Sequence, residues 1–290
     1  MSGVVTVGDN VADVYPSLKS FFPGGNAVNV AVAARRSGVD AAYVGAVGTD
    51  EVGRAIRAAL EDEDVGTDRL RVVDGPSAYC VVELAGGDRH FLGSDLGVSE
   101  FTLDGTDLEY LSGFDCVHTG DCSGTEEQLG DLAAAARLSF DFSDRPSSYC
   151  EPLLDKVWLA CFSGTRLAEG EVTELAKRVL RAGPEVVLVT EGPRGASLFT
   201  AAGEAVHVET ATTAPADTLG AGDAVIGSVL AGMLLGEDLE KIMSSAMLLA
   251  AGVCQHHGGF GHGQTYFDGE GVFPERGHLR RRSDEVEPRA

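Results

Sequence analysis

The sequence predicts one α/β domain with a mostly parallel central sheet, helices on both of its faces and a small β-sheet lid. Short apolar runs alternate with longer helical patterns along most of the 290 residues, an alternation typical of parallel sheets. Two extended segments, residues 11–22 and 78–92, interrupt it and predict a β-layer that projects from the main sheet. The length suits a single domain with a sizeable core.

The individual elements are predicted from apolar runs and from residues that begin or end helices. Predicted strands lie at residues 4–7, 42–47, 115–119, 138–142, 157–161 and 186–190. Predicted helices lie at residues 27–37, 51–62, 126–137, 169–182 and 224–235, with Asp50 as the N-cap of the second. Hairpins are expected within residues 78–92 and 195–209. A single domain is therefore expected at residues 1–266, followed by a polar C-terminal tail at residues 267–290.

The charge balance excludes several classes of protein. Asp and Glu number 45 against 22 Lys and Arg, which gives a formal net charge of -23. Such a chain lacks the basic face that nucleic acids and anionic membranes require. No apolar run is long enough to span a membrane, and the first residues lack a secretory signal pattern, so a cytoplasmic protein is expected. Any phosphate must be held locally, by backbone N–H groups, a metal ion or a few Arg.

The most informative segment is residues 217–223, which read Asp-Thr-Leu-Gly-Ala-Gly-Asp and precede a helical pattern. Gly220, Ala221 and Gly222 carry little side chain, so their N–H groups can approach a ligand at a helix N-terminus, where an anion is favoured. Asp223 lies in the first helical turn, where the helix dipole favours the ionised carboxylate. A general base beside an anion hole suits phosphoryl transfer. Neither a Walker P-loop nor a dinucleotide fingerprint is present.

A second polar segment lies near the N-terminus. All three asparagines of the chain, Asn10, Asn26 and Asn29, fall within twenty residues, beside Asp9 and Asp13. Amides and carboxylates together are what a polyhydroxyl ligand needs, although turns and helix caps use the same residue types. Cys116, His118 and Cys122 lie close together in sequence, but buried residues on a strand and a nearby turn explain them better than a metal site does.

These motifs resemble those of the PfkB, or ribokinase-like, family of carbohydrate kinases, and the resemblance covers roughly residues 4–262. Four motifs follow one another in the family's order. They are Gly-Gly-Asn at 24–26 with Asn29, V-G-x-D-x-x-G from residue 47, T-x-G-x-x-G from residue 190 and D-T-x-G-A-G-D from residue 217, where Glu191 and Leu219 occupy variable positions.

The resemblance implies a ribokinase-like three-layer sandwich and ATP-dependent phosphorylation of a sugar, with Mg²⁺ and in many members a monovalent cation such as K⁺. It also implies roles for particular residues. Asp223 would be the base, and the N–H groups of Gly220, Ala221 and Gly222 the anion hole. The sugar would contact Asn10, Asp13, Gly25, Asn26 and Asn29, the nucleotide would lie along Thr190, Gly192 and Gly195, and Asp217 would contact the monovalent cation. The lid would be a candidate homodimer interface, and Arg194 a candidate side chain for the phosphates.

One family motif is incomplete, and one subgroup is the best match. Residues 161–171, where many members carry N-x-x-E, contain no Asn, so Glu169 or Glu171 is left for the acidic half. Residues 8–16, 24–29, 88–89 and 140–144 resemble the fructoselysine 6-kinases, which implies a fructosamine phosphorylated at its 6-hydroxyl and contacted by Arg89. The open alternatives are a kinase of fructose, ribose, a keto-deoxy sugar acid or adenosine, and a non-catalytic sugar sensor. A nicotinamide oxidoreductase is disfavoured by the missing fingerprint.

Overall fold

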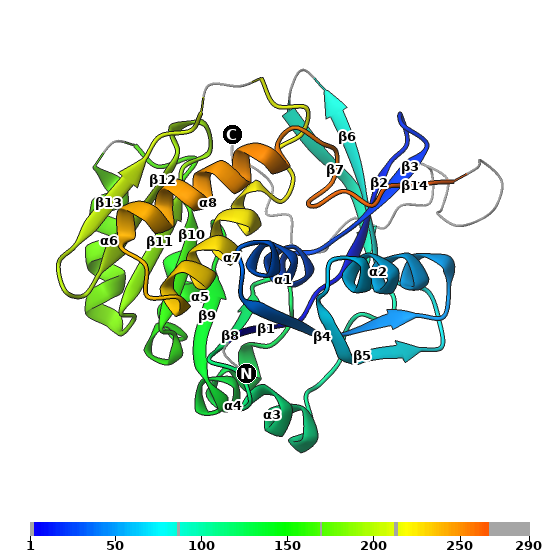
Figure 1. Cartoon of the computed structure of the whole chain (residues 1–290), viewed down its shortest axis with the longest axis horizontal. Helices are drawn as coiled ribbons and strands as arrows, with labels where there is room; N and C mark the ends of the chain where they lie inside the picture. Colours follow the sequence, from blue (N-terminus) through cyan, green and yellow to red (C-terminus); the bar gives the residue numbers. More distant parts are fainter. Residues whose placement is uncertain (1–2, 86–87, 169, 212–213, 267–290) are drawn as a thin grey trace.

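A nine-stranded sheet forms the centre of the computed structural model, which describes residues 3–85, 88–168, 170–211 and 214–266. The strand order is β13-β12-β11-β10-β9-β8-β1-β4-β5 (Figure 1). Six of its parallel strands follow apolar runs: β1 (Gly3–Val7), β4 (Asp40–Gly48), β8 (Cys116–Gly120), β9 (Arg137–Asp141), β10 (Leu159–Ser163) and β11 (Val186–Thr190). β5 (Gly66–Val73) pairs parallel to β4, whereas β12 (Ala196–Thr200) and β13 (Ala205–Val208) add an antiparallel hairpin.

A second, smaller sheet contains the two segments that interrupt the βα alternation. Its order is β14-β3-β2-β6-β7, and its strands are β2 (Val11–Tyr15), β3 (Ser20–Gly24), β6 (Tyr79–Ala85), β7 (Asp88–Asp95) and β14 (Gln264–Thr265). All of its pairs are antiparallel except β2 with β6. The sheet projects beyond the end of the main sheet at the upper right of Figure 1.

Helices cover both faces of the main sheet, and each face has its own core. One core holds residues of α1 (Asn26–Arg36), α2 (Glu51–Asp62), α7 (Ala221–Leu234) and α8 (Leu239–Val253). The other holds residues of α3 (Gly105–Leu111), α4 (Leu129–Ala135), α5 (Ser147–Cys150) and α6 (Glu171–Ala182). Alternation along β11 serves both faces, since Val186 and Leu188 enter the first core while Val187 and Val189 enter the second. Helix, sheet and helix form the expected three layers.

Most predicted elements are confirmed. The second predicted helix has the expected bounds, Glu51–Asp62, and Asp50 caps it by accepting a hydrogen bond from the Gly53 N–H. The predicted helix over residues 126–137 is shorter, because Arg137 already pairs with Cys116 in the sheet. β5 and α8 had no prediction: β5 is an edge strand with charged residues, and α8 is so rich in small residues that its apolar face is weakly marked. The predicted tail at 267–290 lies outside the described residues.

The parallel strands bring polar side chains to one edge of the sheet. Because β1, β8, β9, β10 and β11 run in the same direction, the residues that follow them meet at the carboxyl edge, where ligands bind in open α/β sheets. Asp9, Asp121 and Asp141 end or follow three neighbouring strands. Within the described part of the chain, no helix is long and apolar enough to cross a membrane.

Candidate active site

Asp223 lies in the first turn of α7 and is held by two asparagines of α1. Asn26 donates from Nδ2 to Asp223 Oδ1 at 2.8 Å, and Asn29 donates from Nδ2 to Asp223 Oδ2 at 2.7 Å. Both carboxylate oxygens are therefore fixed by amides that lie 197 and 194 residues away in sequence. Charge-assisted hydrogen bonds and a helix N-terminus both favour the ionised carboxylate. The structure thus brings together the two segments that the sequence singled out.

A second carboxyl group shares one of these amides. Asn26 Nδ2 also donates to Asp141 Oδ2 at 2.9 Å, and Asp141 lies at the end of β9. Burial, followed by the negative charge of Asp223, raises the pKa of Asp141 to about 8. The backbone N–H of Ser143 opposes this shift by bonding to Asp141. The surroundings of Asp141 therefore favour its protonated form near neutral pH.

The start of α1 is fixed by Asp9, a residue for which the sequence gave no specific role. Gly25 adopts a φ of 107°, and a Cβ there would lie 2.8 Å from the Asn10 Cα, so only glycine fits. The Asp9 carboxylate accepts hydrogen bonds from the Asn26 N–H at 2.8 Å and from the Ala27 N–H at 3.3 Å. Burial raises the pKa of Asp9, although these bonds oppose the shift. Asp9 caps a helix from outside it, a pairing that local sequence does not reveal.

The glycine-rich loop has the conformation expected of an anion hole. Gly220 adopts a φ of 74°, and a Cβ there would lie 2.5 Å from the Gly259 Cα, whereas a Cβ on Gly222 would meet open space. The first N–H groups of a helix lack intrahelical acceptors and point along its axis. The Ala221 N–H is directed at the Thr218 carbonyl at 3.3 Å. Of the three expected donors, Ala221 is therefore the one already engaged.

The Asp217 carboxylate accepts hydrogen bonds from two parts of the chain. Its Oδ2 accepts from the Tyr15 hydroxyl at 2.5 Å and from the Gly258 N–H at 3.3 Å. Its Oδ1 accepts from the Leu219 N–H at 3.0 Å. The side chain is fully buried, and it ties the second sheet to the glycine-rich loop. Its contact with a monovalent cation stays a prediction.

The remaining residues predicted to bind sugar differ in how their side chains are placed. Asn10 is 1 % exposed, and its Nδ2 donates to the Tyr43 hydroxyl at 2.9 Å and to the Ala46 carbonyl at 2.7 Å. Asp13 is buried in β2, beside Gly24. A contact between Asn10 and the sugar stays a prediction, since its amide nitrogen is used inside the protein. Arg89 belongs to β7, but its side chain lies outside the described residues.

The residues predicted to line the nucleotide follow β11 at the same edge of the sheet. Thr190 ends β11, Gly192 has a φ of 58°, and Gly195 has a φ of 109° with no room for a Cβ beside the Val208 carbonyl. Arg194, a candidate for the phosphates, donates instead to the carbonyls of Gly164, Thr165 and Leu167. These bonds fix the loop in which N-x-x-E was sought.

The two glutamates considered for that motif have different outcomes. Glu171 Oε2 accepts a hydrogen bond from the Ala168 N–H at 2.6 Å, at the start of α6. Glu169 lies outside the described residues. The acidic half of the motif therefore stays unassigned.

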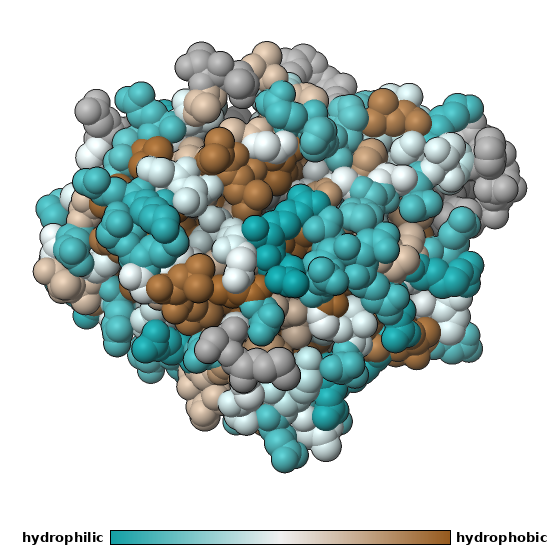
Figure 2. Space-filling view, viewed as in Figure 1, coloured by the Kyte–Doolittle hydropathy of each residue, from teal (hydrophilic) through white to brown (hydrophobic). Residues whose placement is uncertain are grey.

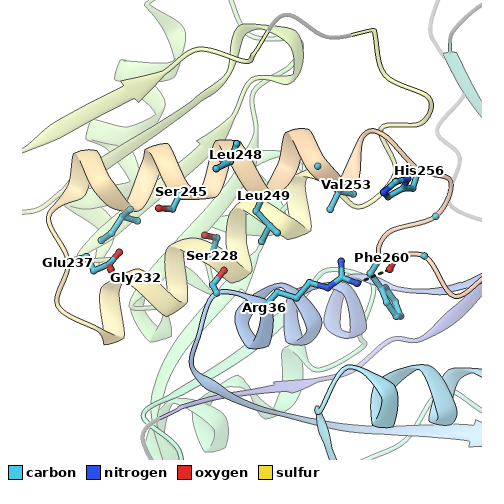
Figure 3. A pocket seen from close by; sticks show the side chains of 15 residues that line it. Arg36, Ser228, Gly232, Glu237, Ser245, Leu248, Leu249, Val253, His256 and Phe260 are labelled. Carbon is cyan, nitrogen blue, oxygen red and sulfur yellow. Dashed lines mark hydrogen bonds between the residues drawn. The ribbon is translucent and has the colours of Figure 1, made fainter.

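A cavity of about 630 Å³ lies elsewhere, on the helical face. Figure 3 shows it between α1, α7 and α8, lined by Ser228, Leu249 and His256 among others. The nearby Arg36 guanidinium is engaged by Glu63 and by the Phe260 carbonyl at 3.0 Å. Figure 2 shows apolar residues over this region, where Leu248 is 76 % exposed. The cavity contains none of the predicted site residues, so the carboxyl edge of the sheet is the better candidate.

Comparisons with known proteins show the fold and the family of the chain. The chain superposes on the ribokinase of Arabidopsis thaliana complexed with ribose and ATP with a TM-score of 0.77, covering 96 % of this chain and 97 % of that one at 20 % identity. The fold is thus that of the ribokinase-like kinases. Residues 14–261 match the pfkB family of carbohydrate kinases, and the chain belongs to that family.

Two curated relatives cover most of the chain. The fructosamine kinase FrlD of Bacillus subtilis (strain 168) is 37 % identical over 91 % of this chain and 94 % of its own length. The fructoselysine 6-kinase of Escherichia coli (strain K12) is 33 % identical over 89 % of this chain and 99 % of its own length. The chain is a sugar kinase, and the subgroup identified from the sequence is among its relatives.

The contact between Tyr15 and Asp217 gives a stability prediction. Tyr15→Phe removes a donor from a buried carboxylate, which is expected to lower the free energy of unfolding by about 2 kcal/mol in urea denaturation. Tyr110→Phe is the matched control, because Tyr110 contacts Phe114 and Arg69 through its ring. Equal stabilities of the two variants would contradict the role given to Tyr15.

Proposed function

We propose that the chain transfers the γ-phosphoryl group of ATP to the 6-hydroxyl of a fructosamine such as fructoselysine. The observation that carries the proposal is the fixed carboxylate of Asp223 at the N-terminus of α7, held between Asn26 and Asn29. The 37 % and 33 % identities to the two relatives support the choice of acceptor. Residues 140–144, which resemble that subgroup, place Asp141 beside Asp223 through the shared amide of Asn26.

The proposed mechanism uses these residues in separate roles. The sugar hydroxyl would give its proton to Asp223 as it attacks the γ-phosphorus in line with the departing ADP oxygen. The N–H groups at Gly220 and Gly222 and the dipole of α7 would stabilise the charge on the transferred group. Mg²⁺ bound to the ATP phosphates would supply positive potential. Its ligands would come mainly from the phosphates and water, as is usual for Mg²⁺ bound with ATP.

The charges around the site fit an acceptor that carries an amine. Asp9, Asp121 and Asp141 meet at the carboxyl edge, and one cation there, Arg145, is paired with Asp121 at 2.6 Å. An ammonium group would relieve the repulsion among these carboxyls, whereas a neutral sugar would not. We therefore favour a fructosamine over fructose, ribose or adenosine.

Other parts of the proposal concern the whole chain. Residues 1–266 would form one kinase domain, with the second sheet as a lid over the sugar. Leu96, which follows β7, is 42 % exposed and would suit a homodimer contact through the lid. The net charge of -23 suits a soluble enzyme of the cytoplasm.

An acceptor panel tests the function directly. With ATP, we expect the protein to turn over fructoselysine with a higher kcat/KM than fructose, ribose, a keto-deoxy sugar acid or adenosine, measured by ADP release. Turnover of fructose or ribose without fructoselysine would refute the acceptor.

Asp223→Asn is expected to lower kcat by about 10²- to 10⁴-fold while ATP still binds. Asp131→Asn, at an exposed position of α4, is the control, and a near-normal kcat in Asp223→Asn would refute the base.

Proton release on binding tests the amine without turnover. At pH 7 the Asp141 carboxyl is mostly protonated, because its pKa is raised to about 8. An ammonium beside it favours the ionised form, so binding of fructoselysine should release up to about one proton. Titration calorimetry in two buffers of different ionisation enthalpy measures this release. Fructose should release none, and equal release by both sugars would contradict the placement of the amine.

A further inference from the structure

Asn26 is part of a longer chain of hydrogen bonds that crosses the sheet. His118 of β8 places Nε2 at 3.1 Å from Asn26 Oδ1 and Nδ1 at 2.9 Å from the Ser139 hydroxyl of β9. His118 and Ser139 are both 0 % exposed. A series of hydrogen bonds therefore links two buried strands to the candidate base, running from Ser139 through His118 and Asn26 to Asp223.

The donors and acceptors in this chain can be arranged in one consistent way. Asn26 Nδ2 uses both of its hydrogens on carboxyl oxygens of Asp141 and Asp223, so Oδ1 must face His118 as an acceptor. Burial lowers the pKa of His118 to about 3, so the ring is neutral and has a single N–H. That hydrogen must lie on Nε2 to reach Asn26, which leaves Nδ1 to accept the Ser139 hydroxyl hydrogen.

The orientation of the Asn26 amide determines whether Asp223 keeps its donor. Rotation of the amide by 180° would place Oδ1 against two carboxyl groups and remove a hydrogen bond from each. The two carboxyl groups oppose this rotation, and His118 adds to their preference, because a flipped amide would also require the His118 hydrogen to move to Nδ1 and the Ser139 hydroxyl to turn. The space for the amide is kept by Gly120, where a Cβ would lie 2.8 Å from Asn26 Oδ1.

We propose that His118 is a positioning residue for catalysis: with Ser139 behind it, it fixes the Asn26 amide so that its nitrogen faces Asp223. His118 is too deeply buried to contact sugar or nucleotide, so it acts through Asn26. The inference rests on the proposed role of Asp223 as the base. It assigns a function to a buried histidine whose place on a strand would by itself suggest only packing.

The charged groups around Asp141 and Asp223 are mainly acidic. Among the described residues they are Asp9 after β1, Asp121 after β8 with its partner Arg145, and Asp141 of β9, beside the neutral Asn29 of α1. The hydrogen bond that Asn26 donates to Asp223 therefore matters for the ionisation of Asp223. Loss of the Asn26 donor would leave Asp223 among these carboxyls with Asn29 as its amide partner. The ionised base would then be harder to form.

Two substitutions of similar size separate positioning from packing. His118→Gln keeps an N–H donor near the position of Nε2, whereas His118→Met fills similar space without a donor. With fructoselysine, or whichever sugar of the panel is turned over, we expect His118→Met to lower kcat by about 10- to 100-fold with little change in the KM for ATP. In the pH profile of kcat, the acid limb, where kcat rises as the base ionises, should move to higher pH in His118→Met. His118→Gln should recover most of the rate and the wild-type limb.

Ser139→Ala provides a second test if His118→Met does not fold, as judged by thermal unfolding. Without the Ser139 hydroxyl, Nδ1 of His118 loses its hydrogen-bond donor and the Nε2–H tautomer is less strongly favoured, so the acid limb should shift in the same direction by a smaller amount. If the foldable variants keep the wild-type limb, or if His118→Met and His118→Gln match at every pH, the positioning role is wrong. If Asp223→Asn itself remains active, the proposed base is wrong, and the two failures are thereby distinguished.

Discussion

The repulsion between carboxyl groups at the carboxyl edge of the sheet is the constraint on which the rest of the site depends. Asp9, Asp141 and Asp223 are drawn together by β1, β9 and α7, and ionised carboxylates at such spacing destabilise one another. The described hydrogen bonds to these carboxyls come from neutral donors, namely two asparagines, backbone N–H groups and a helix N-terminus. The outcome is an uneven pair in which Asp141 holds a proton and Asp223 holds the charge.

The same solution explains how a chain with a net charge of -23 can accommodate ATP. Two arginines described near this edge are already engaged within the protein. Arg194 is engaged by loop carbonyls, and Arg145 is paired with Asp121. α7 begins at the site, so its N-terminus supplies partial positive charge without a basic side chain, whereas the first N–H groups of α1 are taken by Asp9. Mg²⁺ would add further positive potential when ATP is bound. An acidic surface and an anionic substrate are therefore compatible.

The sequence predicted those parts of the site whose residues are close neighbours along the chain. Asp223 and Gly220 lie within one short motif, and a helix start after a glycine pair is recognisable from a few residues. It placed Asp9 in a polar segment without giving it a cap to form, and it gave no role to Asp141 or His118, because their partners lie 17, 115 and 92 residues away. The hydrogen bond from Tyr15 to Asp217 was equally hidden, since the two residues lie 202 apart. Only the packed fold brings such pairs together.

The most direct measurement is a carboxyl-carbon NMR titration of the sugar-free protein, because it observes the charge of each carboxyl group without turnover. The account predicts one carboxyl that titrates near pH 8, and this resonance should vanish in Asp141→Asn and persist in Asp223→Asn. Removing the charge of Asp223 should move that titration to lower pH without abolishing it. If instead a carboxyl still titrated near pH 8 in Asp141→Asn, the proton would lie on a different carboxyl, and the central claim would be contradicted.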